Sequence, residues 1–188
     1  FKSHLDGVFH KFTPERSMDI QRDLGADIIM AFDECTPDQS EHMYAKEAME
    51  RTHRWAQRCI EQWEKNKKLS SQGTYQALFG IVPGSVFRDL REEATKYIAS
   101  LPFDGVAIGG ETVGYNMEKT LEILSWIRDY LPKDKPLYTM GLGRDPKNII
   151  DAIKAGVDMF DCVAPTRMAR NGSLYYGEIR GNEFESEF

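Results

Sequence analysis

Residues 78–110 read LFGIVPGSVFRDLREEATKYIASLPFDGVAIGG, an apolar run, an amphipathic segment and a second apolar run. The first run, LFGIV, ends in a Pro-Gly pair at 83–84, and the last, VAI, ends in a Gly-Gly pair at 109–110. Runs that are apolar on both faces are typical of parallel strands covered by helices. Apolar residues three and four positions apart predict a helix between them: Phe87, Leu90, Ala94, Tyr97, Ile98 and Leu101. The stretch therefore predicts a parallel strand–helix–strand unit.

The same alternation continues on both sides of this stretch. Further apolar runs lie at 27–32, 137–140 and 159–163, helical patterns lie at 13–25, 41–66, 117–130 and 145–156, and an added hairpin strand lies at 174–179. About five strand–helix units predict an α/β architecture, either an open doubly wound sheet or a (β/α)8 TIM-type barrel. A full barrel needs about 200 residues or more, so a chain of 188 residues would hold an incomplete one. In both architectures ligands bind at the carboxyl ends of the strands.

Composition narrows the class of protein. The chain is 41% hydrophobic and 29% charged, which is typical of a folded globular protein. Its net charge of -6 excludes a global positive field for nucleic acid, so RNA binding would need local basic patches. Three cysteines without a CxxC pair argue against a disulfide framework or a zinc ribbon, and no apolar run approaches the ~20 residues of a membrane span. Because the chain starts without methionine and stops in an acidic stretch, we interpret it as an internal fragment of a longer protein.

Two aspartates stand where strands are predicted to end. Asp33 follows the run at 27–32, and Asp161 lies inside the run at 159–163. An unpaired carboxylate is costly to bury, which makes both positions candidates for chemistry. An aspartate at a strand end is also common as an Asx turn or a helix N-cap, and that alternative stays open for each residue alone. From spacing alone, the sequence predicts a parallel α/β enzyme with a carboxylate-rich site.

Three motifs carry a resemblance to a known family: AFDECTP at 31–37, FDGVAIGG at 103–110 and MFDCVAPTRMARNG at 159–172. In this order and spacing they resemble the tRNA-guanine transglycosylases of bacterial type, also called queuine tRNA-ribosyltransferases. The resemblance implies a (β/α)8 barrel with a C-terminal zinc subdomain. Residues 1–188 would then be part of a single catalytic barrel domain, without its N-terminal strands or the zinc subdomain. Structural zinc is accordingly expected in the full-length protein, and no metal site within this fragment.

The resemblance also implies a reaction. Members exchange the guanine at the wobble position of tRNA for a 7-deazaguanine, in queuosine biosynthesis or queuine salvage, by double displacement through a covalent ribosyl-aspartate. A carboxylate can trap the oxocarbenium-like state that forms when the base leaves. The implied partners are a tRNA with a GUN-type anticodon, the 7-deazaguanine and, in the full-length protein, a second copy. A cytoplasmic protein without membrane contact is expected, and the fragment alone is expected to be inactive because the family's general-base aspartate lies upstream of Phe1.

Motif by motif, the resemblance assigns roles to individual residues. Asp161 of MFDCV matches the nucleophile, and Asp33 of FDEC matches the aspartate that pairs with the pyrimidine edge of the base. A carboxylate that accepts two N–H donors there selects bases with an exocyclic amine. The other base-binding matches are Cys35 in the pocket wall, Gly110 with its backbone N–H on the base carbonyl, and Tyr138 and Met140 on either side of the ring.

Two loops are implied to contact RNA. The TRMAR segment, with Thr166, Arg167 and Arg170, matches the loop that holds the anticodon near the wobble base. Guanidinium groups suit phosphates and base edges. The segment at 141–147 matches a second RNA-contacting loop, with one residue more between Met140 and Asp161 than in the usual bacterial spacing, and its matching residues are Gly141, Gly143 and Arg144.

Three positions depart from the family pattern. Pro83 stands where a glutamine usually reads the base, Glu111 where leucine is common, and Tyr115 where glutamate is common. Proline supplies no side-chain donor, so one hydrogen bond to the base should be missing. We predict a base preference different from that of the typical bacterial enzyme, toward a larger or preformed deazaguanine. Two alternatives stay open, a catalytically silent RNA-binding partner subunit and base exchange on another polynucleotide.

Overall fold

The computed structural model describes residues 1–143, 145–181 and 183–186. Five strands form one parallel sheet in chain order: β1 (Ile28–Met30), β2 (Ala77–Val82), β3 (Gly105–Ile108), β4 (Leu137–Thr139) and β5 (Met159–Phe160). Every strand pairs in parallel with the next one along the chain. This order has no switch point at which the winding reverses, so the predicted incomplete barrel is confirmed and the doubly wound alternative is wrong.

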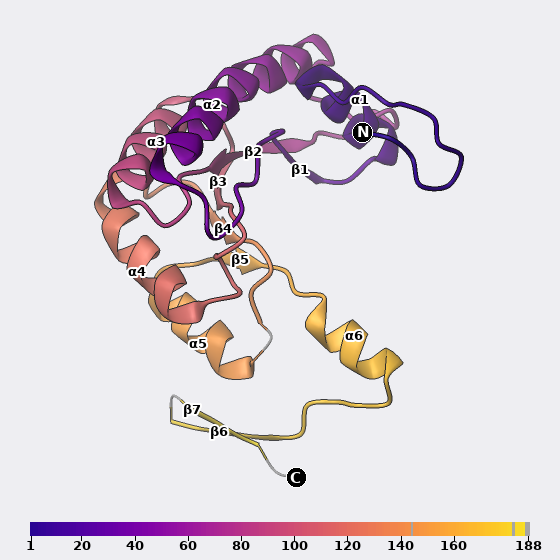
Figure 1. The fold of residues 1–188 in the computed structure, drawn as a ribbon. Coiled ribbons are helices and arrows are strands. Elements are labelled where there is room, and N and C mark those ends of the chain that lie inside the picture. The colour runs from indigo at the N-terminus through magenta and orange to yellow at the C-terminus, as the bar shows by residue number, and fades with distance from the viewer. Residues whose placement is uncertain (144, 182, 187–188) are drawn as a thin grey trace.

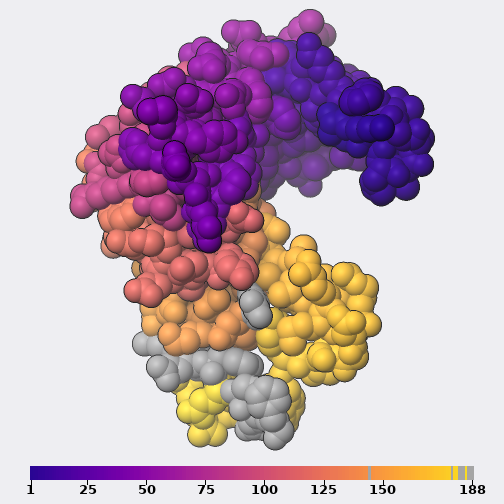
Figure 2. Space-filling model, in the orientation of Figure 1, coloured from indigo at the N-terminus to yellow at the C-terminus, as the bar shows by residue number. Residues whose placement is uncertain are grey.

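Helices connect the strands along the outer side of the sheet. They are α1 (Pro14–Leu24), α2 (His42–Lys65), α3 (Arg88–Ser100), α4 (Met117–Ile127) with a 3-10 turn η1 (Arg128–Tyr130), and α5 (Pro146–Lys154). Figure 1 shows α2 to α5 following the convex side of a curved sheet, with the strands inside the curve. The surface is accordingly an open arc, hollowed between the N-terminal segment and the C-terminal part of the chain (Figure 2). The chain thus builds a five-stranded half-barrel.

Local capping explains where the helices begin and end. Thr13 accepts the Arg16 N–H at the start of α1, Pro14 occupies its first turn, and Gly25 closes it with a φ of 77°. Asn116 caps α4 in the same way through the Lys119 N–H. These side chains satisfy backbone donors that a helix start leaves free.

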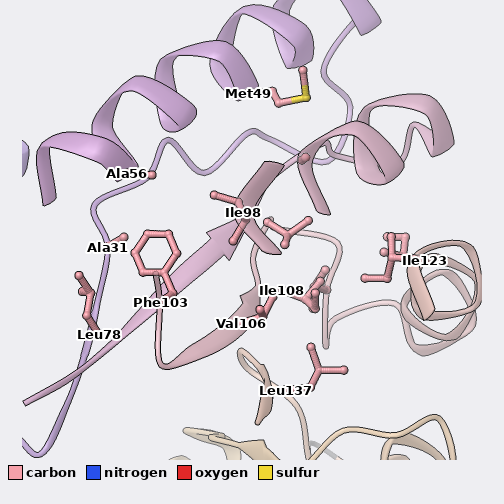
Figure 3. Packing of buried hydrophobic residues seen from close by; sticks show 14 of the residues in the cluster. Ala31, Met49, Ala56, Leu78, Ile98, Phe103, Val106, Ile108, Ile123 and Leu137 are labelled. Carbon is pink, nitrogen blue, oxygen red and sulfur yellow. The ribbon is translucent and has the colours of Figure 1, made fainter. Parts of the chain in front are cut away.

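The core lies between the sheet and its helices. Figure 3 shows Ile98 of α3 and Phe103 packed against the sheet, with Ile108 of β3 facing the helix that carries Ile123. Full burial of such a side chain stabilises the fold by about 1.5–3 kcal/mol. Gly105 is required here because a Cβ at this position would stand 2.4 Å from the Phe79 ring. The half-barrel therefore has a packed core of its own behind strands β2 and β3.

The C-terminal part differs from the sequence-based expectation. The strand predicted at 159–163 ends at Phe160. The TRMAR segment at 166–170, which was expected to form a loop, lies in a short helix, α6 (Ala164–Arg170), with proline in its first turn. The hairpin strand predicted at 174–179 begins later, as β6 (Gly177–Arg180), and pairs antiparallel with β7 (Glu183–Ser186). Within the described ranges, no helix is both long and apolar enough to cross a membrane.

Candidate functional site

Asp33 lies directly beyond the carboxyl end of β1. The segment that carries it is fixed by backbone donors at the Ala31 and Glu34 positions: the Ala31 N–H bonds to the Phe79 carbonyl at 2.9 Å and the Glu34 N–H to the Thr52 hydroxyl at 3.1 Å. The Asp33 carboxylate faces Gly109, where a Cβ would stand 3.4 Å from its Oδ2 atom. Burial raises the pKa of Asp33 to about 6, and the charge of Glu34 adds to the rise. The site thus holds a desolvated carboxylate beside the Gly109-Gly110 turn.

Cys35 joins this carboxylate to the loop after β3. Partial burial raises the pKa of its thiol, and the charges of Asp33 and Glu111 raise it further. The backbone of Gly110 and the guanidinium of Arg91 act in the opposite direction on the same pKa. Asp33 lies against Gly109 and Arg91 lies against Gly110, so the structure places both side chains at the same turn.

A pair of hydrogen bonds braces the two loops against each other. The backbone N–H of Asp38 donates to a carboxylate oxygen of Glu111 at 2.8 Å, and the Thr112 hydroxyl donates to the Asp38 carboxylate. The loops are separated by more than 70 positions along the chain. Glu111 thus holds the Asp33–Asp38 loop against the loop after β3.

Asp161 is the first residue after β5, and its side chain is exposed. The Tyr138 hydroxyl of β4 donates to its Oδ1 atom at 2.5 Å, and the Gly141 N–H lies 3.3 Å from the same oxygen. Burial, the hydrogen bond to Asp161 and the charge of that carboxylate raise the pKa of Tyr138, so the phenol stays a donor. The sequence did not predict this contact, because strand register alone places Tyr138 beside Met159, two residues before Asp161.

Two neighbouring cavities open beside these residues. The larger one measures about 620 Å³ and includes Asp161, Gly141 and Arg167 in its lining. The smaller one, about 450 Å³, is lined by Pro37, Asp38, Gln39, Glu111 and Tyr115. Glu111 and Tyr115 line both, so these two residues form the boundary between the cavities. Asp33 is not among the described residues that line either cavity.

The remaining predicted residues lie around this edge of the sheet. Pro83 is buried at the end of β2, and Met140 is half-buried after β4. Gly143 is buried with Cys162 nearby, because a Cβ there would stand 3.4 Å from the Cys162 Cβ. On α6, the Thr166 hydroxyl bonds to the Val163 carbonyl and Arg170 is exposed. Arg144 lies outside the described residues.

Sequence reasoning missed Arg91 although a signal was present. Position 91 lies four residues after Phe87 and three before Ala94, which places it on the apolar stripe of α3. Its side chain is fully buried. A charged residue on a buried stripe is rare unless it has a specific role. Among the described residues, no group of three or more His, Cys, Asp or Glu side chains could hold a metal ion; the zinc subdomain stays a prediction for sequence outside this chain.

Sequence comparisons with known proteins identify the family of this chain. The family model described as queuine tRNA-ribosyltransferase matches residues 1–185. A queuine tRNA-ribosyltransferase from Herpetosiphon aurantiacus is 50% identical over 182 residues, which cover 97% of this chain and 44% of the relative. Another from Natranaerobius thermophilus is 49% identical over 192 residues, which cover 100% of this chain and 50% of the relative. The chain therefore spans about half the length of the curated relatives it matches, and it belongs to the queuine tRNA-ribosyltransferase family.

Proposed function

We propose that the protein containing this chain exchanges guanine at the wobble position of a tRNA for a 7-deazaguanine, with Asp161 as the nucleophile. The observation that carries the proposal is the Asp161 carboxylate, exposed at a strand end in a cavity of about 620 Å³ and oriented by Tyr138 and Gly141. Both donors act on Oδ1, so we assign bond formation to Oδ2. Membership of the family supports the reaction class.

The proposed chemistry is a double displacement. Asp161 Oδ2 forms a bond to the ribose C1′ atom while the bond from C1′ to guanine N9 breaks, and the bonding electron pair leaves with the base. The deazaguanine then loses its N9 proton to water and its N9 atom displaces the carboxylate, which restores Asp161 and retains the configuration at C1′. The Tyr138 hydroxyl and the Gly141 N–H hold Oδ1 through both steps, so the carboxylate does not have to reorient between them.

Base recognition is assigned to the other end of the half-barrel. Asp33 accepts the N–H donors on the pyrimidine edge of the base, and the Gly110 N–H donates to the base carbonyl. Cys35 lines the pocket wall, and Met140 packs against the ring of the base. The pocket needs an ionised carboxylate for this, although burial raises the pKa of Asp33 to about 6. A bound base with two N–H donors favours the charged form and would lower that pKa.

Specificity for the substituent on the base is assigned to the boundary between the two cavities. Glu111 and Tyr115 separate the larger cavity from the smaller one lined by Asp38 and Gln39. A substituent at position 7 of the deazapurine would pass between the Glu111 and Tyr115 side chains. Two carboxylates, on Asp38 and Glu111, stand there, so a larger base with a positively charged amine fits better than bare guanine.

RNA contacts belong to the same proposal. Arg167 lines the cavity that contains Asp161, and Arg170 is exposed on the same helix, one turn further on. Thr166 begins this basic segment, and Gly141 and Gly143 lie in the facing loop. The tRNA with a GUN-type anticodon, the homodimer, the structural zinc and a cytoplasmic location remain parts of the proposal for the full-length protein.

A base-exchange assay on the full-length protein tests the function. We expect labelled guanine to be lost from the wobble position of tRNA on addition of deazaguanine, and a covalent protein–RNA adduct to accumulate without it. Guanine, the aminomethyl deazaguanine and queuine would be compared as incoming bases, with a typical bacterial member as reference. Identical preferences in the two enzymes would refute the predicted shift in specificity.

A catalytically silent RNA-binding subunit is the second candidate, favoured by Pro83, Glu111 and Tyr115. This alternative predicts tRNA binding without adduct and without exchange. Exchange at another position or on another polynucleotide would instead give an adduct that maps away from the wobble nucleotide. The three outcomes are separated by locating the RNA residue that becomes attached to the protein.

A further inference from the structure

Arg91 is a fully buried cation behind the base-binding turn. Its Nε atom donates to the Ser85 carbonyl at 2.7 Å, and its Nη1 atom donates to the Val82 carbonyl at 2.8 Å. Both acceptors are neutral backbone groups at the carboxyl end of β2. Within residues 1–143, 145–181 and 183–186, no ion pair joins Arg91 to a carboxylate. The charge of this side chain is therefore not neutralised by the described part of the protein.

The third nitrogen of the guanidinium points at the site. Nη2 is buried without a hydrogen-bond partner among the described residues, and a Cβ on Gly110 would stand 3.0 Å from it. Gly110 has a φ of 116°, so glycine both permits this backbone conformation and leaves room for Nη2. The buried cation thus lies directly against Gly110.

Asp33 and Cys35 lie at the same Gly109-Gly110 turn. Asp33 faces Gly109 through its Oδ2 atom, and the Cys35 thiol responds to both the Gly110 backbone and the Arg91 charge. Burial lowers the pKa of Arg91 to about 10, which leaves the guanidinium charged at neutral pH. A charge in such a dry environment is screened far less than at the surface, so its field reaches across one layer of backbone.

We infer that Arg91 is a positioning residue that favours departure of the purine as an anion, acting through the Gly109-Gly110 backbone. The inference rests on the proposed function. When the bond between C1′ and N9 breaks, the electron pair goes to the base, and its negative charge spreads to the carbonyl oxygen that faces the Gly110 N–H. The bond to C1′ is replaced by one to Asp161, and the base takes up a proton on nitrogen only afterwards. A fixed cation behind the turn stabilises the base most when it carries this charge.

An electrostatic role of Arg91 and a purely structural role predict different rates of departure for differently charged bases. Guanine leaves as an anion, whereas 7-methylguanine, which starts as a cation, leaves as a neutral base. The field of Arg91 assists the first departure and not the second. The rate of guanine departure divided by the rate of 7-methylguanine departure, measured within one variant, therefore reports the electrostatic role. Misfolding of part of the sample lowers the amplitude of adduct formation and leaves this ratio unchanged.

The test measures single-turnover adduct formation by the full-length enzyme on RNAs that carry guanine or 7-methylguanine at the wobble position. For Arg91→Met we expect guanine departure to slow by about tenfold or more and 7-methylguanine departure to change by less than about threefold. Arg91→Lys, which keeps the charge, should restore part of the ratio. Thr95→Val is the matched control, because Thr95 is fully buried on the same helix and donates to the Arg91 carbonyl at 2.7 Å. It removes a buried hydrogen bond without removing charge, so its ratio should stay at the wild-type value.

The outcomes are distinct. Equal slowing of both leaving bases in Arg91→Met, or no slowing of either, would overturn the inference and leave Arg91 a structural residue. A ratio in Arg91→Lys as low as in Arg91→Met would also count against a role for the charge. Absence of any adduct in the wild-type enzyme on both RNAs would instead refute the proposed function itself.

Discussion

The two ends of the sheet treat their aspartates differently. Beyond β1 to β3, Asp33 is half-buried, its loop is braced through Glu111, and the strands behind it are covered by helices. Beyond β4 and β5, Asp161 is exposed, follows a strand of two residues and is held by one hydroxyl and one backbone N–H. The Asp33 end of the half-barrel is therefore partly buried and held by hydrogen bonds between loops, whereas the Asp161 end is exposed to solvent.

This difference suits the two proposed tasks. Recognition of a planar base gains from a rigid, desolvated carboxylate, because an unsatisfied donor or acceptor is costly there. A nucleophile needs an open approach for the ribose and the RNA backbone, with only its orientation fixed. Two carboxylates in contrasting environments are a common way for an active site to divide its roles. Variants at the two ends should therefore affect different kinetic constants.

The largest effect is expected for Asp161→Asn. The amide is a far weaker nucleophile than the carboxylate, so base exchange by the full-length enzyme should fall by about 10⁴-fold and the covalent RNA adduct should disappear. Folding should be little affected because the side chain is exposed. Gel analysis of adduct formation and thermal unfolding measure the two quantities. Asp134→Asn, in an exposed loop before β4, is the control and should leave both unchanged. An adduct that survives in Asp161→Asn would remove Asp161 from the chemistry.

The next largest effect is expected for Asp33→Asn. The substitution replaces one acceptor oxygen by an NH₂ donor, which then faces an N–H donor of the base. Base binding should therefore weaken by about 30- to 100-fold. The KM for the base should carry this loss, with a smaller change in the rate of adduct formation. Titration of the incoming base in the exchange assay separates the two constants. A loss confined to adduct formation would contradict the division of roles between the two ends.

Asp33 also predicts a pH dependence. Its pKa in the protein is raised to about 6, so the carboxylate becomes protonated as the pH falls through that value and cannot accept two N–H donors. Base affinity should increase as the pH rises from about 5 to about 8 and then level off, whereas Asp33→Asn should bind independently of pH across this range. Stability changes in the opposite direction: the folded protein holds the proton more tightly than the unfolded chain, so stability is lost as the pH rises through about 6. The difference in Tm between Asp33→Asn and wild type should therefore grow with pH over this range.

The sequence predicted the alternation of strands and helices because its signals are local, whereas the choice of a barrel over an open sheet came from the family resemblance. Apolar runs, capping residues such as Thr13 and helical spacing each depend on a few neighbouring positions. It also predicted that Asp33 and Gly110 lie at one edge of the sheet, since parallel strands end on the same side. The β5 strand was predicted too long because MFDCV is apolar throughout, whereas Pro165 favours a helix start close behind it. The Glu111 brace and the Tyr138 contact join residues distant in sequence, and no local pattern encodes such pairs.

A moderate effect is expected for Tyr138→Phe. The variant keeps the aromatic ring and removes only the hydroxyl that donates to Asp161. A hydrogen bond to a charged group contributes about 1.5 kcal/mol or more, so adduct formation should slow by about tenfold while the KM for the base stays unchanged. Tyr138→Leu, which removes the ring as well, is the companion variant. A normal rate in Tyr138→Phe with weakened base binding in Tyr138→Leu would assign Tyr138 to the base ring, as the resemblance implies, rather than to the nucleophile.

The smallest effect is expected for the brace between the two loops. Glu111→Leu leaves the Asp38 N–H without its acceptor. One hydrogen bond of this kind contributes about 1 kcal/mol, so base binding should weaken by about fivefold and Tm should fall slightly. Glu111→Gln keeps an acceptor oxygen for the Asp38 N–H and should keep the Tm close to that of wild type. Thr112→Val removes the reciprocal bond to Asp38. Because the two bonds meet at one residue, the double variant should lose less than the sum of the single losses. Full additivity would show that the two bonds hold the loop independently of each other.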